Sequence, residues 1–318
     1  MTSEFAEFHD ELRSVAGDLL AKDRRVQWST LVDAGWVGLE VPEQSGGAGA
    51  SFAEVAVVCA EIGRAASATG YLGGAVLAVG ALNTLQPSDT RDRLLTDIAS
   101  GAVRVAVALD PFDFVPDAEG ADRILMVTDR GVGVTDVPAV PRPVVDETRS
   151  LAAVPPDAQL TDLLPFAGDA GAAVQRLHDR AAVAIACDSL GLSEAMLDAT
   201  VGYAKVRHQF GRAIGSFQAV KHACADMLVS IAVSRQLVGA AVQAVAEDRP
   251  DAGSAASMAK AHACAAAVDI AGKAMQLHGG IGYTWESGIH VYLKRATLNR
   301  SLFGSPAVHR KRLAQRYL

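Results

Sequence analysis

Hydrophobic residues recur every three or four positions over much of the first hundred residues, which is the spacing of amphipathic helices. The pattern covers Phe8, Leu12 and Val15, and it returns over Phe52–Ile62. Between these segments lies Trp36–Gly49, a stretch rich in Gly and Pro that predicts a loop. The sequence therefore predicts an N-terminal helical domain over residues 1–100.

The period changes between residues 101 and 168. Hydrophobic residues alternate over Val103–Val107, and Ile124–Thr128 followed by Gly131–Val134 has the pattern of a strand, a turn and a second strand. Eight of the 12 prolines lie between positions 111 and 165, and proline breaks long helices. We expect a small, shortened β domain over residues 101–168.

Long helical patterns return in the last part of the chain. One apolar stripe runs through Leu192–Val206, a second through Phe217–Val245, and a third from Ser254 to His278, where two glycines signal a helix end. Long helices with short connections predict a four-helix-type bundle over residues 169–318. The expected fold is mainly α with a small β domain between two helical domains.

Composition and charge exclude several classes of protein. The 318 residues carry a formal net charge of −7, which argues against sequence-independent binding of nucleic acid. The longest apolar run, Tyr71–Leu82, is shorter than the roughly 20 residues of a membrane span. The four cysteines lie far apart without a C-x-x-C pair and predict reduced core residues of a cytoplasmic protein, with no metal site: Cys59, Cys187, Cys224 and Cys264.

Common catalytic motifs fail. Gly131-Val-Gly133 lacks the third glycine of a Rossmann fingerprint, and Ser45–Gly49 lacks the Gly-Lys-Ser/Thr of a P-loop. The chain has neither H-E-x-x-H nor G-x-S-x-G. These absences argue against zinc-dependent hydrolysis and serine-hydrolase chemistry.

Two constellations remain. In the first, an apolar helix reaches Arg207, turns at Gly211 and Gly215, and restarts at Phe217. A guanidinium and the amide of Gln209 beside backbone N–H groups would suit a pyrophosphate, although an exposed arginine at a helix corner is the simpler interpretation.

In the second constellation, Gln276-Leu-His278 is followed by Gly279 and Gly280. Glycines let a flat or phosphorylated ligand approach the backbone closely. An ordinary helix C-cap explains the same residues.

Taken together, the two constellations resemble the C-terminal signatures of the acyl-CoA dehydrogenase family, R-x-x-F-G-x-x-I-x-x-F-Q and Q-x-x-G-G-x-G-Y. The loop Gly38–Gly49 is similar to a segment of that family's N-terminal domain. The resemblance runs from about Val32 to the C-terminus. It implies FAD as cofactor, an acyl-CoA substrate that is desaturated between its α and β carbons, and an electron-transfer flavoprotein as electron acceptor.

The resemblance also assigns residues. Tyr203 and Arg207 would border the acyl-CoA substrate. The cofactor contacts, made to the FAD of a neighbouring subunit, would come from Arg207, Gln209, Phe210, Ile214, Gln218, Gln276, His278, Gly279 and Gly280.

Family chemistry needs a carboxylate base, and the usual glutamate position holds Phe303. Some members of the family place the base earlier, in the helix before the arginine motif, and that position holds Ala181 here. The chain has no Asp or Glu after Glu286. The flavin-holding loop of the family is replaced by Val107–Phe114. In these losses the chain resembles the smaller subunit of the α2β2 heterotetrameric acyl-CoA dehydrogenases of bacterial steroid degradation, whose full-length partner supplies the glutamate.

Two other functions fit the sequence. The chain could be a structural or regulatory pseudo-subunit without flavin contact, or a self-sufficient homomeric enzyme with a relocated base at Asp179, Asp188 or Glu286. The sequence also leaves the identity of the acyl group undecided. Small residues before Tyr203 would leave room for a bulky, steroid-derived group, or would simply allow close helix packing: Ala181, Ala184 and Gly191.

Overall fold

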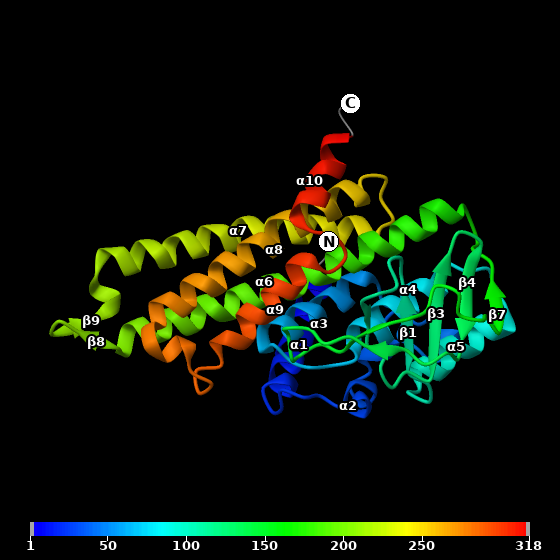
Figure 1. Ribbon diagram of the computed structural model, residues 1–318, viewed down its shortest axis with the longest axis horizontal. Helices are drawn as coiled ribbons and strands as arrows, with labels where there is room; N and C mark the ends of the chain where they lie inside the picture. The colour runs from blue at the N-terminus through cyan, green and yellow to red at the C-terminus, as the bar shows by residue number, and fades with distance from the viewer. Residues whose placement is uncertain (1–2, 316–318) are drawn as a thin grey trace.

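A long helical bundle forms the body of the molecule, with the helical N-terminal domain packed against its middle and the small β domain at one end (Figure 1). The computed structural model describes residues 3–315. The opposite end of the bundle projects away from both other domains and carries a short hairpin (Figure 1). The predicted fold, mainly α with a small β domain, is confirmed.

The N-terminal domain is helical because its apolar stripes are bounded by clear helix signals. The helix α3 starts after Ser51, whose hydroxyl accepts a hydrogen bond from the N–H of Ala53 (3.1 Å) while Glu54 accepts one from the N–H of Ser51 (2.8 Å). The elements are α1 (Ser3–Leu20), α2 (Trp28–Asp33), η1 (Trp36–Gly38), η2 (Glu43–Ser45), α3 (Phe52–Ala65), η3 (Leu72–Leu77), α4 (Ala78–Asn83) and α5 (Asp89–Ala99).

The β domain is built on a four-stranded sheet in the order β1-β3-β4-β7. Its strands β1 (Val105–Ala108) and β3 (Arg123–Thr128) are parallel, whereas β4 (Gly131–Thr135) and β7 (Asp162–Leu164) continue it in antiparallel fashion. The hairpin of β3 and β4 confirms the predicted strand, turn and strand. A second sheet has the order β2-β6-β5, from Val115–Pro116, Leu151–Ala153 and Val140–Pro141.

Side chains on alternate positions of β1 pack into two different hydrophobic clusters. Val105 and Val107 face a cluster that includes the helices α4 and α5, while Ala106 and Ala108 face a smaller cluster toward the second sheet. Successive side chains of a strand point to opposite faces, so a strand that is covered on both faces is apolar throughout.

Three long helices run back and forth in the bundle, α6 (Ala170–Val206), α7 (Gln218–Ala246) and α8 (Ala252–His278). Consequently the end of α6, the start of α7 and the end of α8 lie together at the projecting end (Figure 1). The remaining elements are β8 (His208–Gln209), β9 (Arg212–Ala213), η4 (Ile214–Ser216), η5 (Gly279–Tyr283), α9 (Ile289–Ser301) and α10 (Pro306–Ala314).

Two sequence expectations need adjustment. Cys224, expected in the core, is only half-buried on α7, whereas the other three cysteines are buried and all four are free thiols. The second concerns membrane spans. Among the described residues, α7 is long and apolar enough to cross a membrane by length and composition alone. In the structure α7 packs against α6 and α8 through buried residues that include Met227, Ile231 and Val238.

Candidate functional site

The two constellations of the sequence meet at the projecting end of the bundle. Tyr203 near the end of α6 stacks on His278 at the end of α8, with ring centroids 4.4 Å apart and planes tilted by 21°. Because α6 and α8 run in the same direction, residues that are far apart in the chain come together at their C-terminal ends.

A hairpin presents the arginine motif. The strands β8 and β9 are joined at Phe210 and Gly211, which both adopt left-handed backbone angles (φ 52° and 78°), as a tight hairpin turn requires. Arg207 ends α6: its N–H donates to the carbonyl of Tyr203 (2.9 Å), and its own carbonyl accepts from the N–H of Ile214 (2.8 Å). The backbone of Arg207 is therefore fixed while its side chain is exposed.

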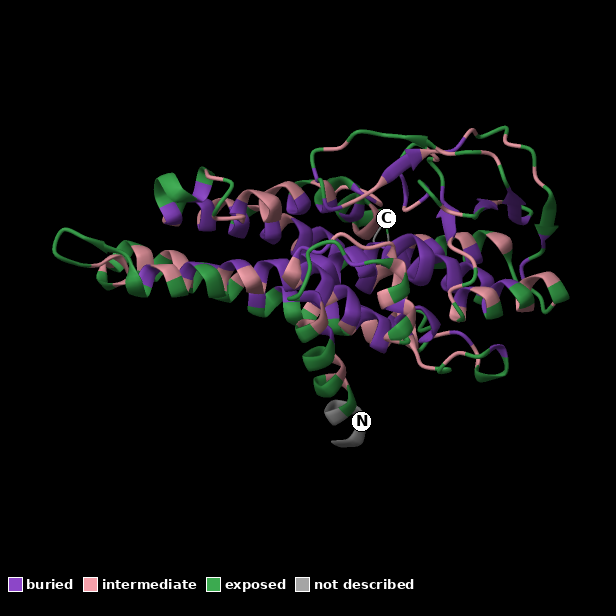
Figure 2. Cartoon of the chain, turned by 90° about the horizontal axis from the view of Figure 1, so that it is seen from below, coloured by how far each residue is buried: buried purple, intermediate pink, exposed green. Residues whose placement is uncertain are grey.

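Most of the predicted cofactor residues are exposed at this end, as Figure 2 shows for the hairpin. Phe210 has an exposed fraction of 91%, unusual for an aromatic ring. Ile214 is half-buried. The exposed members are Arg207, Gln209, Phe210, Gln218, Gln276, Gly279 and Gly280.

His278 differs from the others. Its ring is buried, and its Nδ1 lies 2.7 Å from the carbonyl of Ala274 in the preceding turn of α8. Stacked on Tyr203 as well, His278 is placed to position the neighbouring side chains and offers little surface of its own.

The chemistry of this end fits FAD. A Cβ added to Gly279 or Gly280 would meet no atom within 4 Å, so the space above that backbone is open. The guanidinium of Arg207 donates no hydrogen bond to another described residue, and an unpaired guanidinium suits a pyrophosphate. Sequence reasoning left out Arg212 of the hairpin, whose guanidinium lies 4.1 Å from the centre of the Phe217 ring just before α7.

Phe303 lies at a different place, on the wall of a cavity of about 490 Å³ between the β domain and the bundle. The loop Val107–Pro116 forms one wall, and the turn between α9 and α10 forms another. This turn is fixed by Lys260 of α8, whose ammonium donates hydrogen bonds to the carbonyls of Asn299 and Gly304 (2.9 Å each). The structure thus brings together the two segments in which the resemblance predicts that the family's residues are replaced.

None of the three carboxylates weighed as a relocated base lines this cavity. Asp179 is paired with Arg312, and Glu286 is exposed in the loop before α9. Asp188 is buried where α6 meets α9, 2.6 Å from a guanidinium nitrogen of Arg295. Burial alone would raise its pKa, but the charges of Arg295 and Arg149 outweigh that effect and lower it to about 2.

Two titratable groups that sequence reasoning missed do line the cavity, Asp110 and His178. Burial lowers the pKa of His178, so its imidazole is neutral at physiological pH. Both had a signal in the sequence: Asp110 lies within the replaced loop Val107–Phe114, and His178 directly precedes Asp179.

The small residues of α6 serve helix packing. Ala181 and Ala184 are buried, and a Cβ on Gly191 would lie 1.9 Å from the carbonyl oxygen of Ala60 in α3. Gly191 therefore permits close contact between two helices and leaves no room for an acyl group there.

Comparison with known proteins shows which family the chain belongs to. The family model described as acyl-CoA dehydrogenase, N-terminal domain, matches residues 2–102, and the model for the C-terminal domain matches residues 171–318. The acyl-CoA dehydrogenase IpdE2 of Mycobacterium tuberculosis is 37% identical over 288 residues, which cover 90% of this chain and 85% of the relative.

Solved structures share the fold over nearly the whole chain. A steroid ACAD variant, Tcur3481-Tcur3483, superposes with a TM-score of 0.84 and 25% identity, covering 98% of this chain and 97% of that one. A chain of the ChsE4-ChsE5 complex from Mycobacterium tuberculosis has a TM-score of 0.85 at 23% identity, covering 100% and 98%. With both helical domains matched by family models, the chain belongs to the acyl-CoA dehydrogenase family.

Proposed function

We propose that this chain is a subunit of an FAD-dependent acyl-CoA dehydrogenase and that it contacts an FAD held mainly by a full-length partner subunit. The observation that carries the proposal is the separation of two regions. Exposed donors without a partner among the described residues gather at the projecting end of the bundle. In the described part of the chain, no carboxylate lines the cavity at the turn that holds Phe303, where the resemblance places the family's base.

At the projecting end, Arg207 would hold the negative charge of the pyrophosphate, and Gln209 and Gln276 would donate amide hydrogen bonds. Gly279 and Gly280 would let the cofactor approach the backbone. Bound FAD supplies the hydride acceptor of the desaturation. Tyr203, stacked on His278, would border the acyl-CoA. Contact in trans requires exposed groups, and Arg207, Gln209 and Gln276 are exposed.

Proton removal from the α carbon would fall to the partner. Phe303 has no atom that can accept a proton, so a glutamate of the full-length subunit would act as base. The names of relatives support a heteromeric assembly, since one solved neighbour is a ChsE4-ChsE5 complex and another pairs Tcur3481 with Tcur3483. The proposed assembly is an α2β2 heterotetramer that acts on a steroid-derived acyl group, passes electrons to an electron-transfer flavoprotein and lies in the cytoplasm.

A second candidate is a self-sufficient homomeric enzyme. It is favoured by Asp110 and His178, which line the cavity and could each accept a proton. Turnover of an acyl-CoA by the purified chain alone, lost on changing Asp110 to Asn, would establish this function and overturn the partner-supplied base.

Removing the cofactor arginine tests the main proposal. In the complex co-purified with its partner, Arg207→Ala should weaken FAD retention about tenfold to a hundredfold, because a charge-assisted hydrogen bond contributes roughly 1.5–3 kcal/mol. The FAD content per complex is measured from flavin absorbance over a dilution series.

Arg93→Ala is the matched control, since Arg93 is exposed on α5 in the N-terminal domain and far from the hairpin in the sequence. The control should retain FAD like the unmodified complex. Equal FAD occupancy in Arg207→Ala and Arg93→Ala would favour a structural pseudo-subunit without flavin contact.

A further inference from the structure

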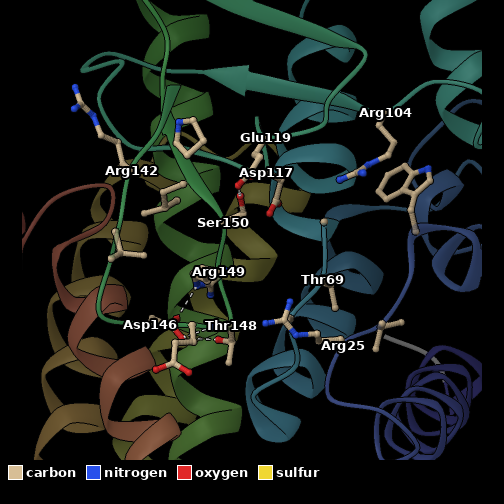
Figure 3. A pocket seen from close by; sticks show the side chains of 18 of the residues that line it. Arg25, Thr69, Arg104, Asp117, Glu119, Arg142, Asp146, Thr148, Arg149 and Ser150 are labelled. Carbon is tan, nitrogen blue, oxygen red and sulfur yellow. Dashed lines mark hydrogen bonds and ion pairs between the residues drawn. The ribbon is translucent and has the colours of Figure 1, made fainter. Parts of the chain in front are cut away.

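A second large cavity, of about 620 Å³, lies between the N-terminal domain and the β domain (Figure 3). One wall comes from the loop Arg25–Trp28 and from Ala68–Gly70, and the other from Arg104, Asp117–Glu119 and the strap Pro141–Leu151. It shares no lining residue with the cavity at Phe303. The function proposed above makes no use of it.

The acidic side chains of this cavity already have partners. Each of the four carboxylates accepts a hydrogen bond or forms an ion pair within the described residues. The partners are Gly73 for Asp117 (2.7 Å), Ser150 for Glu119 (3.1 Å), Thr148 for Asp146 (2.9 Å) and Lys294 for Glu147 (2.6 Å).

Two of its arginines have no such partner. Among the described residues, the guanidinium groups of Arg25 and Arg104 donate no hydrogen bond and lie in no ion pair, and Figure 3 shows both extending into the cavity. Arg149, by contrast, is 2.9 Å from Asp188, and Arg142 lies 3.6 Å from Asp113. The cavity therefore holds two cations whose hydrogen-bonding capacity is unused.

The backbone at both arginines is fixed by contacts within the chain. The N–H of Arg104 donates to the carboxylate of Asp122 (2.8 Å), and Arg25 lies in a β-bridge with Ala68. The guanidinium of Arg104 is 6.0 Å from the Trp28 ring centroid.

Two further lining residues, Arg149 and Asp146, carry buried polar atoms without a hydrogen-bond partner among the described residues. The side chain of Arg149 has an exposed fraction of 10% and that of Asp146 is fully buried, yet Nε of Arg149 and Oδ2 of Asp146 lack hydrogen-bond partners in the described part of the chain. These atoms lie 3.9 Å apart, too far for a hydrogen bond between them. Buried polar atoms without partners indicate a polar occupant.

From this geometry we propose that the cavity binds a small organic anion, with its carboxylate or phosphate on Arg25 and Arg104 and its body against Trp28 and Val144. A planar guanidinium donates two parallel hydrogen bonds to such a group, so two of them make a selective clamp. Trp28 and Val144 supply the apolar surface beside the clamp.

The pH dependence of this binding follows from Asp117, which lines the same cavity. Burial raises the pKa of Asp117 to about 6, against the opposing charges of Arg149, Arg104 and Arg295, and the neighbouring Glu119 is exposed. An ionised Asp117 repels an incoming anion, whereas a protonated one does not. Binding should therefore tighten as the pH falls from 7.5 through about 6.

Calorimetric titration of the purified full-length chain tests the clamp with three probes, 2-naphthoate, the neutral 2-naphthamide and inorganic phosphate. We expect saturable binding of 2-naphthoate and at least about tenfold weaker binding of the amide. Comparison with phosphate decides which of the two anionic groups the clamp prefers.

Variants locate the binding. Arg25→Gln and Arg104→Gln should each weaken the binding of 2-naphthoate about tenfold or more. Arg130→Gln, at an exposed turn outside the cavity, should leave that affinity unchanged. Asp117→Asn keeps an acceptor for Gly73 and tolerates the left-handed φ of 58°, so it should tighten binding at pH 7.5 and remove the pH dependence.

Arg25 is exposed, so its replacement leaves the fold intact even if Arg104→Gln does not. The proposal is overturned if neither anion binds saturably at millimolar concentration, if the amide binds as well as the carboxylate, or if Arg25→Gln binds like the unmodified chain. Because Arg207 and Phe303 lie outside this cavity, none of these results bears on the proposed dehydrogenase function.

Discussion

Asp188 shows how a residue suited to catalysis by type can be structural by position. It accepts hydrogen bonds from Arg295 (2.6 Å) and Asn299 (2.7 Å) and is paired with Arg149, all in the interior where α6 meets α9. The carboxylate thereby links the bundle to the β domain strap. A buried charge is stable only while its partners remain.

Asp188→Ala should therefore lower the free energy of unfolding by about 3–5 kcal/mol at pH 7, because it leaves Arg295 buried without its partner. The control is the exposed Asp198 on the same helix, which is paired with Arg64 of α3, and Asp198→Ala should cost less than about 1 kcal/mol. Urea unfolding of both variants gives the comparison. Equal losses would contradict the assignment.

The same carboxylate sets a pH window. Its pKa is about 2 in the folded protein against a normal value of 3.8. The stabilisation that ionised Asp188 contributes is therefore complete above about pH 5 and is lost as the pH falls through about 2. The difference between the unmodified chain and Asp188→Ala should shrink over that interval.

At the scale of elements, two glycines set the contact between α3 and α6. A Cβ on Gly63 would lie 2.0 Å from the carbonyl oxygen of Asp188, and one on Gly191 would lie 1.9 Å from that of Ala60. The helix backbones touch directly, which no larger residue allows. This contact joins the N-terminal domain to the bundle.

Gly191→Ala should thus destabilise the fold by about 1–3 kcal/mol or more, since backbone must move to admit the methyl group. Gly202→Ala on the same helix is the matched control, because an added Cβ there meets nothing within 4 Å. It should stabilise the protein by roughly 0.5–1 kcal/mol through better helix propensity. Thermal unfolding of both variants measures the contrast, and a tolerated Gly191→Ala would contradict it.

At the scale of the whole molecule, the bundle leaves apolar surface uncovered. Leu228 and Val229 on α7 have exposed fractions of 53% and 64%, and Val233 one turn further along has 43%. Exposed apolar residues grouped on one helix mark an interface. We predict that a partner subunit of the proposed assembly covers this helix.

Val229→Glu should therefore weaken association with the partner, because it places a charge in the buried interface. The unfolding transition of the isolated chain should stay unchanged, because this side chain is exposed there. Native mass spectrometry of co-expressed subunits reports the complex. Arg130→Glu, an exposed change in the β domain, should leave the complex intact. An intact complex in both variants would place the interface elsewhere.

The sequence by itself determined the class of fold and the positions of its main elements. Hydrophobic period, proline content and glycine stops are local properties, so they predicted the hairpin of β3 and β4 and the end of α8 at His278. The order of the motifs around Arg207 and Gln276 also sufficed to indicate the family, which the family models confirm.

Only the tertiary structure decided which side chains are available. By residue type, Asp188 could act as a base and Gly191 could leave room for an acyl group. In the structure Arg295 pairs with Asp188 and Ala60 packs against Gly191, both from distant segments, so each residue is structural instead. The cavity with Arg25 and Arg104 is likewise invisible in the sequence. Burial, charge pairing and clefts depend on contacts between segments that no local pattern records, and these contacts arise when the domains pack.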